Sequence, residues 1–538
     1  MPQFNLTVNN SRGIIGPVPT PHLKLDSLPG ASDSQIISAS SLSMSLPQLP
    51  KRFFRHGWQS WTLTTWLDPS DQPLPIRSPE FRAKDEDLAY TFSKNHIGAW
   101  VGAVELEEED ILLLGALELG GRVELDATTL RGFYEADHDG QWLISRGPED
   151  VVFSKYTSFL ETKFGKTRFD KAPRVWCSWY SLYKWINERV ILKALDGIRN
   201  LPFDVFQIDD GWQDISGNWE AGRKFPSGMA ALADKIKASG RIAGLWLSPF
   251  IVTPKQKLFH EHPDWLLRDE KGDLVSAGIS WTGKTYALDI THPAVLGWLD
   301  QVIRRVVGWG FGYLKLDFLY AGAVAGKRTK DIPREVAYRN ALQAIREAAG
   351  DAYILACGAP IIPSLGLCDG IRIGPDVTPY WLNKALTMWL NNPNESSTQN
   401  AIRTSIHRLW LKPLVNVDPD VLFFRSKYNA LSQHENQLLQ DLGSISGFKA
   451  TSDLPQWLKA NERVTLSEFL ESNPNIEKKS RYKYQIDGRE VDFSPAIPIQ
   501  SSDQNIPVWL AKDLGLLKIV KHQALPAIRE TFWPWRQV

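Results

Sequence analysis

Cysteine is scarce in this sequence. The 538 residues include only three cysteines, Cys177, Cys357 and Cys368, and no paired Cys-x-x-Cys motif. Three thiols cannot form a disulfide framework, and without paired cysteines a structural zinc site of the usual kind is not expected. The sequence therefore predicts a reducing, cytoplasmic environment, and it gives no sign of a bound metal.

Long apolar runs and targeting signals are also lacking. No stretch approaches the roughly 18 uncharged apolar residues that a membrane-spanning helix needs. The first residues, MPQFNLTVNNSRG, have neither the basic n-region nor the apolar h-region of a signal peptide. We therefore expect neither a membrane span nor a cleaved leader.

A net charge of either sign is missing as well. Lysine and arginine total 61, aspartate and glutamate total 61, and no block of basic residues occurs. Domains that bind nucleic acid usually carry a basic excess, and anionic membranes attract basic clusters. Nucleic acid and membranes are therefore poor candidates as partners, and we expect a neutral small molecule as the ligand.

The composition that is present favours a large globular protein. Hydrophobic residues make up 43% of the chain, enough for full cores, and the length suggests about three or four domains. The 22 tryptophans are unusually many. They suit large cores and sheet packing, and they equally suit a protein whose indole rings stack on the apolar faces of sugars. Composition does not decide between these two uses.

Three regions differ in their pattern. Residues 1–165 contain short β-like runs separated by Pro, Gly, Ser and Asp, which predicts an N-terminal β-sandwich domain. Residues 166–460 alternate apolar strands with amphipathic helices. Residues 461–538 return to short pieces such as RYKYQIDGREVDF and PVWLAKDLGLLKIV, which predicts a small C-terminal β domain.

The central region predicts a parallel sheet. Apolar strands alternating with helices over roughly 290 residues are typical of a closed (β/α)8 TIM barrel. An open, doubly wound sheet is the alternative, but its phosphate-binding glycine loop must follow a strand, and GWGFG near Gly308 precedes one. The eight expected strands begin near Arg174, Asp204, Arg241, Tyr313, Tyr353, Gly370, Leu414 and Ser444.

Polar and aromatic residues gather where these strands end. In a barrel the carboxyl ends of the strands form the active-site face. A single Asp at such an end is often only a helix cap, but capping explains the whole set poorly. The set comprises Trp179, Asp209, Asp210, Trp246, Lys315, Asp317, Cys357, Gly358, Arg372, Asp376, Asp418 and Asp420.

Two carboxylates in this set suggest glycosidic chemistry. Lys315 and Asp317 are two positions apart on one strand, so both side chains point to the barrel interior, where the ammonium would keep the carboxylate ionised. Asp376 follows Arg372 by four residues in the motif RIGPD. One ionised carboxylate and one proton-donating carboxyl group are what hydrolysis of a glycosidic bond requires. Asp209 and Asp210 could accept hydrogen bonds from sugar hydroxyls.

Five ordered motifs carry a resemblance to a known family. FQIDDGW, GLWLSPF, YLKLDF, ILACGAP and RIGPDVTPYW resemble glycoside hydrolase family 36, the α-galactosidase family. The similarity covers roughly residues 172–450 and extends to HGWQSW at His56–Trp61 in the N-terminal region. The length is similar to that of compact bacterial and archaeal members.

The resemblance implies a role for each matching residue. Asp317 would be the nucleophile and Asp376 the general acid/base of a retaining mechanism without cofactor or metal, with the two carboxyl groups about 5–5.5 Å apart. Trp61 would be an aromatic residue that the N-terminal domain contributes to the site. The galactose contacts would be Trp179, Asp209, Asp210, Trp246, Lys315, Cys357, Gly358 and Arg372.

The implied activity is removal of terminal α-linked galactose from oligosaccharides such as melibiose or raffinose. A raffinose-synthase-like galactosyl transferase and an α-N-acetylgalactosaminidase remain as alternatives on the same scaffold, and a non-catalytic sugar-binding protein is a more remote one. The segment from Asn416 to Asp420 has one residue more than the corresponding motif in related families. We therefore expect Asp418 and Asp420 to have supporting or capping roles. The sequence leaves the oligomeric state open.

Overall fold

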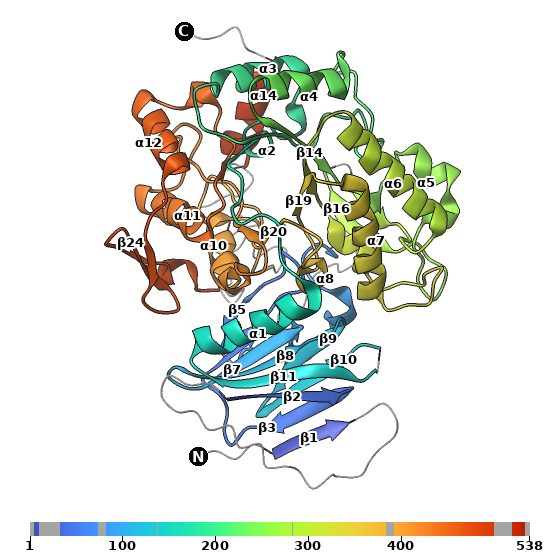
Figure 1. The fold of residues 1–538 in the computed structure, drawn as a ribbon, viewed down its shortest axis with the longest axis vertical. Coiled ribbons are helices and arrows are strands. Elements are labelled where there is room, and N and C mark those ends of the chain that lie inside the picture. Colours follow the sequence, from blue (N-terminus) through green and yellow to red (C-terminus); the bar gives the residue numbers. More distant parts are fainter. Residues whose placement is uncertain are drawn as a thin grey trace.

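The computed structural model describes residues 5–9, 33–73, 82–136, 138–281, 283–383, 392–499 and 519–532. Within these ranges the chain forms a two-sheet β region, a curled parallel sheet surrounded by helices, and a smaller C-terminal part (Figure 1). No helix in these ranges is both long and apolar enough to cross a membrane.

The N-terminal region consists of two antiparallel sheets. A five-stranded sheet has the order β1-β3-β10-β9-β6, and a six-stranded sheet has the order β2-β11-β8-β7-β4-β5. The strands are β1 (Asn5–Asn9), β2 (Asp33–Ala39), β3 (Ser41–Ser45), β4 (Arg52–Arg55), β5 (Thr65–Leu67), β6 (His96–Ala99), β7 (Val101–Glu107), β8 (Asp110–Ala116), β9 (Gly121–Asp126), β10 (Thr129–Tyr134) and β11 (Gly140–Gly147).

Alternation along β8 shows how this region is packed. Leu112 and Leu114 belong to a core cluster that also contains Leu42 of the five-stranded sheet, so the two sheets pack face to face. Ile111 and Leu113 point the other way and belong to the large core of the central region. Successive residues of a strand face opposite sides, so one strand can contribute to both cores. Strand β8 of the six-stranded sheet is therefore buried on both faces.

The N-terminal region also contains a long helix that the sequence prediction did not include. Helix α1 (Glu149–Phe164) lies between the six-stranded sheet and the central region (Figure 1). Its buried residues include Val152, Phe153, Tyr156 and Leu160, which follow a helical spacing. The pattern is present in the sequence, but β-branched and aromatic residues dominate it, and such residues also suit strands.

The central region contains the predicted eight-stranded parallel sheet. Its order is β21-β20-β19-β18-β14-β13-β12-β22. Seven of the eight predicted strand positions match observed strands to within about two residues. The strands are β12 (Val175–Cys177), β13 (Val205–Ile208), β14 (Ile242–Leu247), β18 (Tyr313–Leu316), β19 (Tyr353–Ala356), β20 (Gly370–Arg372), β21 (Asn416–Asp418) and β22 (Ala450–Thr451).

The predicted position of the eighth strand is wrong. The run SISGF near Ser444 was expected to be a strand, but Ser444 lies in helix α11 (Gln433–Ser446), and β22 follows at Ala450–Thr451. Helix α11 ends at Gly447 with a φ of 79°. A glycine with positive φ commonly ends a helix. A strand of only two residues leaves little pattern in a sequence.

The two edges of the parallel sheet approach each other. Leu422, four residues after β21, forms a parallel bridge with Thr451 of β22. Its amide nitrogen donates a hydrogen bond to the carbonyl oxygen of Ala450 at 2.8 Å. The sheet is therefore strongly curled, as a barrel-like arrangement requires.

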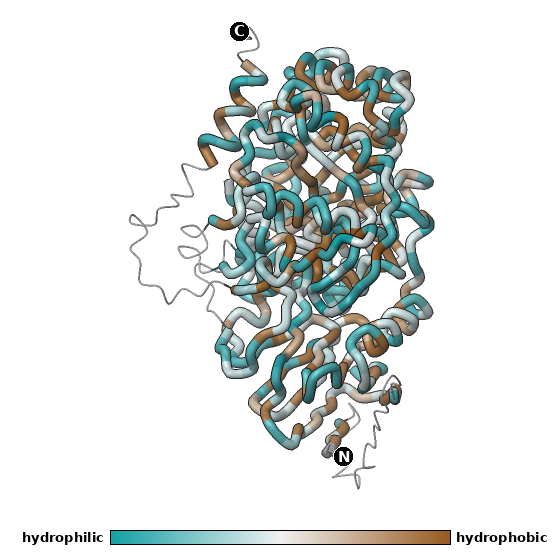
Figure 2. The backbone as a smooth tube through the Cα atoms, turned by 90° about the vertical axis from the view of Figure 1, so that its left-hand side faces the viewer, coloured by the Kyte–Doolittle hydropathy of each residue, from teal (hydrophilic) through white to brown (hydrophobic). Residues whose placement is uncertain are grey.

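Helices follow most strands of this sheet and cover its outer side (Figure 1). Figure 2 shows the helix-covered region above the two-sheet region, with apolar stretches running through the interior of the former. The helices include α3 (Glu188–Gly197), α4 (Gly228–Ala238), α6 (Pro293–Gly308), α7 (Arg334–Ala349), α8 (Ile361–Ser364) and α10 (Thr398–Ile406). A small sheet of β15 (Ile251–Val252), β16 (Ser276–Ser280) and β17 (Gly283–Ala287) is inserted between β14 and α6.

The C-terminal part is only partly β. A three-stranded antiparallel sheet of β23 (Ile476–Lys478), β24 (Lys483–Ile486) and β25 (Arg489–Asp492) matches the run RYKYQIDGREVDF. Helix α12 (Ala460–Glu471) precedes this sheet, and helix α14 (Leu525–Phe532) ends the described chain. Most of PVWLAKDLGLLKIV lies outside the described residues.

Candidate active site

The predicted catalytic residues meet in one cavity at the carboxyl ends of the parallel strands. The cavity has a volume of about 210 Å³. The two-sheet region borders it, because the segment after β4 contributes Trp61. Six residues predicted from the sequence line the cavity: Trp61, Trp179, Asp209, Lys315, Asp317 and Asp376.

Two hydrogen bonds fix the carboxylate of Asp317. Oδ1 accepts a hydrogen bond from the amide of Phe318 at 2.8 Å, and Oδ2 accepts one from Nε1 of Trp246 at 2.9 Å. Phe318 has a φ of 52°. A large side chain rarely adopts this left-handed conformation, and such strain is common at active sites. The conformation of Phe318 turns the backbone sharply just after β18, so that the amide of Phe318 can donate its hydrogen bond to the carboxylate of Asp317.

Burial raises the pKa of Asp317 above its ordinary value. Lys315 and the indole N–H of Trp246 oppose this effect, since both favour the ionised form, whereas Asp376 and Asp209 add to it. Asp376 thus lies close enough to act electrostatically on Asp317. Pairs of interacting carboxyl groups in one cleft are typical of sites that use one carboxylate and one carboxylic acid.

The hydrogen-bonded partner of Lys315 is Asp209. Its ammonium donates a hydrogen bond to Oδ2 of Asp209 at 2.9 Å, and both residues are buried. The sequence pattern links Lys315 to Asp317, and the two do interact electrostatically. Burial lowers the pKa of Lys315, but Asp209 and its other neighbours outweigh it, so the net shift is upward. The ammonium stays charged beside Asp317.

Asp210, the residue after Asp209, accepts a hydrogen bond from a residue of the small inserted sheet. Trp281, at the turn between β16 and β17, donates its indole N–H to Oδ2 of Asp210 at 2.7 Å. Burial raises the pKa of Asp210 to about 6, although the Trp281 hydrogen bond opposes this shift. Trp281 itself lines the cavity, with its ring 4.7 Å from that of Trp179. An aromatic pair of this kind suits the apolar face of a sugar ring.

Asp376 occupies the more open side of the cavity. Its side chain is 36% exposed, whereas Asp317 is buried. Nη1 of Arg372 donates a hydrogen bond to Oδ1 of Asp376 at 3.1 Å, and Nε1 of Trp61 reaches the same oxygen at 3.4 Å. A carboxyl group in this position can contact both solvent and a bound ligand.

Asp418 and Asp420 both form ion pairs with the guanidinium of Arg372. Nε of Arg372 lies 3.3 Å from Oδ2 of Asp418, and Nη2 lies 2.6 Å from Oδ1 of Asp420. Asp420 also accepts hydrogen bonds from the hydroxyl of Tyr180 and the amide of Val377. Both carboxylates contact Arg372, and neither is among the residues that line the cavity. Together they fix the guanidinium that holds Asp376.

Gly358 provides the space for Trp61. Its φ is 56°, and a Cβ at this position would lie 2.4 Å from the indole ring of Trp61. The amide of Gly358 also donates a hydrogen bond to Oγ of Ser60 at 2.8 Å. Cys357, the preceding residue, is buried, and burial raises the pKa of its thiol. Any side chain larger than hydrogen at residue 358 would displace the ring.

Arg408 holds the segment that carries Trp61. Its two terminal nitrogens donate to carbonyl oxygens of Gly57, Gln59, Ser60 and Thr62 at 2.8–3.2 Å. Burial lowers the pKa of Arg408 to about 9. One buried guanidinium from the barrel region thus satisfies four backbone acceptors of the N-terminal region. This contact fixes the position of the segment.

The cavity also contains residues that the sequence prediction missed. Lys84 and Asp85 come from the segment before β6, and Asn394 precedes α10. None of them lies at a strand end, so the barrel pattern gave no signal for them. Five predicted residues do not line this cavity: Asp210, Trp246, Cys357, Gly358 and Arg372. Asp210, Trp246 and Arg372 form hydrogen bonds with residues that do, and Gly358 lies against the ring of Trp61.

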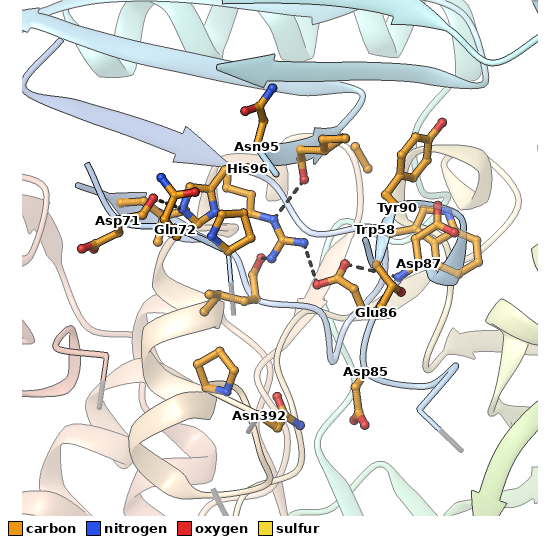
Figure 3. A pocket seen from close by; sticks show the side chains of 18 of the residues that line it. Trp58, Asp71, Gln72, Asp85, Glu86, Asp87, Tyr90, Asn95, His96 and Asn392 are labelled. Atoms are coloured by element: carbon orange, nitrogen blue, oxygen red, sulfur yellow. Dashed lines mark hydrogen bonds and ion pairs between the residues drawn. The ribbon is translucent and has the colours of Figure 1, made fainter. Parts of the chain in front are cut away.

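A second, larger cavity of about 370 Å³ lies on the other side of Asp85. Figure 3 shows it from close by, with Asp85, Glu86 and Asn392 among the lining residues; Glu86 forms an ion pair with Arg55. The larger cavity contains neither Asp317 nor Asp376. The site chemistry therefore belongs to the smaller cavity.

In the described part of the chain, no three His, Cys, Asp or Glu side chains are grouped as ligands of a metal ion. The polar groups of the cavity are engaged with one another or directed at the cavity. Their arrangement is suited to hydrogen bonding with a neutral, hydroxyl-rich ligand.

Comparison with known proteins connects this site to one family. The family model called Melibiase matches residues 146–346. A solved α-galactosidase from Thermus thermophilus is 42% identical, with a TM-score of 0.82 over 87% of this chain and 98% of that one; its structure contains p-nitrophenyl α-D-galactopyranoside. Another structure of the same enzyme contains stachyose.

Curated relatives match over shorter segments. α-Galactosidase 1 of Pediococcus pentosaceus is 28% identical over 31% of this chain and 24% of its own length. A type blood α-D-galactosamine galactosaminidase of Flavonifractor plautii is 28% identical over 36% of this chain and 17% of its own length. The matched segments thus span about a quarter or less of these relatives.

A curled parallel sheet with two carboxyl groups in one cavity at its carboxyl edge is an arrangement that can catalyse the hydrolysis of a glycosidic bond. Nearly the full length of the Thermus thermophilus enzyme is matched at 42% identity. This chain belongs to the Melibiase family, the family of the α-galactosidases.

Proposed function

We propose that this protein is a retaining exo-α-galactosidase that removes terminal α-linked galactose from oligosaccharides of the melibiose and raffinose type. The observation that carries the proposal is the shared cavity of Asp317 and Asp376, one held by Trp246 and the other by Arg372. The complexes of the Thermus thermophilus relative with a galactoside and with stachyose support the substrate class.

In the first step the ionised carboxylate of Asp317 attacks the anomeric carbon of galactose. The bond from this carbon to the glycosidic oxygen breaks, and Asp376 gives its proton to that oxygen as the leaving group departs. The product of the step is a covalent ester between galactose and Asp317. The buried setting of Asp317 suits this role, because a poorly solvated carboxylate reacts readily once it is ionised.

In the second step a water molecule replaces the leaving group. The carboxylate of Asp376 takes a proton from this water, whose oxygen attacks the anomeric carbon and releases Asp317. Two displacements at one carbon restore the original α configuration. The 36% exposure of Asp376 supports this part, since water must reach the group that activates it.

The remaining predicted residues would bind the galactose ring. Lys315 and Asp209 form a buried donor–acceptor pair at the bottom of the cavity, and Trp179 offers an aromatic face. Asp210, Trp246, Arg372, Cys357 and Gly358 do not line the cavity. In the proposal Gly358 makes room for Trp61, and the other four orient the contact groups or reach galactose after small side-chain movements. No cofactor or metal takes part in the proposed reaction.

The proposal includes a closed (β/α)8 TIM barrel at residues 166–460, with a β-sandwich domain at 1–165 and a C-terminal domain at 461–538. The bridge between Leu422 and Thr451 supports closure of the barrel. We also propose a cytoplasmic location, which the three free, buried cysteines support.

A panel of 4-nitrophenyl glycosides that differ only in sugar and anomer tests the substrate assignment. The proposal predicts hydrolysis of the α-galactoside well above all others, with α-galactose as the first product by NMR. The Flavonifractor plautii relative makes α-N-acetylgalactosaminide the second candidate substrate. If the protein preferred that glycoside, it would be assigned as an α-N-acetylgalactosaminidase and not as an α-galactosidase. Mainly transfer products from raffinose, in place of free galactose, would indicate a transferase.

A further inference from the structure

We propose that Lys84, on the segment between β5 and β6, binds the hydroxyl groups of the leaving sugar and so selects oligosaccharides as substrates. This inference rests on the proposed galactosidase function. It concerns the side of the cavity that lies beyond the galactose-binding residues.

The position of Asp376 shows which side receives the leaving group. The group that protonates the glycosidic oxygen must stand next to the leaving group. Asp376 is the exposed carboxyl group of the pair, whereas Asp209, Lys315 and Asp317 are buried at the bottom. Galactose would therefore occupy the buried end, and the leaving sugar would extend past Asp376 toward the opening.

Lys84 lies on the Asp376 side of the cavity, because Asp376, and not Asp317, is among the charges with the largest effect on its ammonium. It lines the same cavity as Asp376, together with Asp85 and Asn394. Burial lowers the pKa of Lys84, but Asp85, Glu395 and Asp376 raise it by more, so the net shift is upward. The side chain of Lys84 is therefore a charged donor in the cavity of the acid/base residue, close enough to interact with it electrostatically.

The ammonium of Lys84 is available to a ligand. Among the described residues it has no hydrogen-bond or ion-pair partner, although three carboxylates act on it electrostatically. The neighbouring Asp85 is paired with Arg82, and Glu395 accepts a hydrogen bond from Asn392 at 3.2 Å. The carboxylates around Lys84 thus have other partners, which leaves its three N–H groups free to donate to sugar hydroxyls.

The segment itself is anchored. Nε2 of Gln59 donates a hydrogen bond to the carbonyl oxygen of Lys84, and Gln59 belongs to the same segment as Trp61. Asp85, the next residue, lines both this cavity and the larger one. The hydrogen bond from Gln59 thus fixes the backbone of Lys84 at the wall of the cavity.

The test compares two substrates that release alcohols of similar acidity. Melibiose and methyl α-galactoside both release a primary alcohol, so both need the same protonation by Asp376. Only the leaving group of melibiose carries further hydroxyl groups. The measured quantity is the ratio of kcat/KM for melibiose to kcat/KM for methyl α-galactoside.

Lys84→Met keeps the aliphatic stem and removes the donors. We expect the ratio to fall about 10-fold or more, since hydrogen bonds to charged groups contribute about 1.5–3 kcal/mol. Lys84→Gln, which retains an N–H donor without the charge, should recover part of the ratio. Lys94→Met, at an exposed lysine of the same region, serves as the control and should leave the ratio unchanged.

An equal loss on both substrates would overturn the proposal, because Lys84 would then act through Asp376 or through galactose. An unchanged ratio would overturn it as well. The wild-type protein is measured first on both substrates. If it hydrolyses neither, the galactosidase assignment fails; if it hydrolyses both and the ratio is insensitive to Lys84, only the role of Lys84 fails. Circular dichroism confirms that each variant is folded.

Discussion

The indole nitrogen of Trp61 lies 3.4 Å from Oδ1 of Asp376, so a residue of the N-terminal two-sheet region donates a hydrogen bond to a carboxylate of the barrel region. Arg372 binds the same oxygen from within the barrel region. The proposed acid/base residue is therefore held by two regions that are far apart in the sequence. Its geometry depends on how these regions pack against each other.

Gly358→Ala should disturb the site by displacing Trp61. The new methyl group would lie 2.4 Å from the indole ring, and overpacking of this kind costs about 1–3 kcal/mol. We expect kcat/KM for 4-nitrophenyl α-galactoside to fall at least 10-fold, together with a lower Tm. Gly350→Ala is a matched control, because Gly350 has the same φ of 56° but no atom within 4 Å of the added Cβ. It should lower Tm without lowering activity. Equal effects of both substitutions on activity would contradict the role of Gly358.

Trp246→Phe should move the acid side of the pH profile to higher pH. The indole N–H stabilises the ionised form of Asp317, so its removal raises the pKa of that carboxyl further. Activity requires the ionised form and is lost as pH falls through this pKa. We expect the acid limb of kcat/KM to rise by about one pH unit, as a hydrogen bond of about 1.4 kcal/mol would give. Trp298→Phe, on helix α6, should leave the limb in place. A shift to lower pH would contradict the assigned role of Trp246.

Arg408→Met should weaken both stability and substrate binding. The substitution removes a donor from five buried carbonyl oxygens, those of Gly57, Gln59, Ser60, Thr62 and Ile373. The oxygen of Gln59 keeps the amide of Thr62 as a donor, and each of the others loses its partner at a cost of about 1–3 kcal/mol. Urea unfolding should show a loss of at least about 3 kcal/mol, and KM should rise because Trp61 loses its support. Arg304→Met, on the exposed side of α6, should change stability by less than about 0.5 kcal/mol. A stable Arg408→Met variant with normal KM would show that Arg408 does not hold the Trp61 segment in place.

Much of the site could be predicted because a parallel sheet brings its strand ends together. Asp209, the pair of Lys315 and Asp317, and Asp376 come from three distant parts of the sequence, yet the alternation of strands and helices places all four at one edge. The same reasoning predicts seven of the eight strands. It fails for the eighth because β22 has only two residues, and helix α11 covers the run that was predicted as a strand.

The other side of the cavity could not be predicted in this way. Lys84 and Asp85 lie in a segment without helical or strand periodicity, and Trp281 lies at the turn of a small inserted sheet. Their positions depend on how the N-terminal region and the insertion pack against the barrel region. Packing between such regions leaves no periodic signal in the sequence. In addition, none of the family motifs contains Lys84, Asp85 or Trp281.

The distance between the carboxyl groups gives a further prediction. A retaining mechanism expects about 5–5.5 Å between the carboxyl groups of Asp317 and Asp376 in a complex with substrate. A crystal structure with bound galactose would measure it directly. A separation of about 6.5–9.5 Å would instead leave room for a water molecule and indicate an inverting enzyme.

The most direct test of the central assignment is chemical rescue by azide, with the product configuration determined by NMR. Asp317→Gly should lose activity on all substrates, and azide should restore some of it and yield β-galactosyl azide, because the anion attacks from the face that the carboxylate occupied. Asp376→Gly should still form the covalent intermediate from 4-nitrophenyl α-galactoside, since this leaving group needs little protonation. Azide should then yield α-galactosyl azide. If the two products were exchanged between the variants, Asp376 would be the nucleophile and Asp317 the acid/base, and the proposed roles of the two carboxyl groups would be wrong.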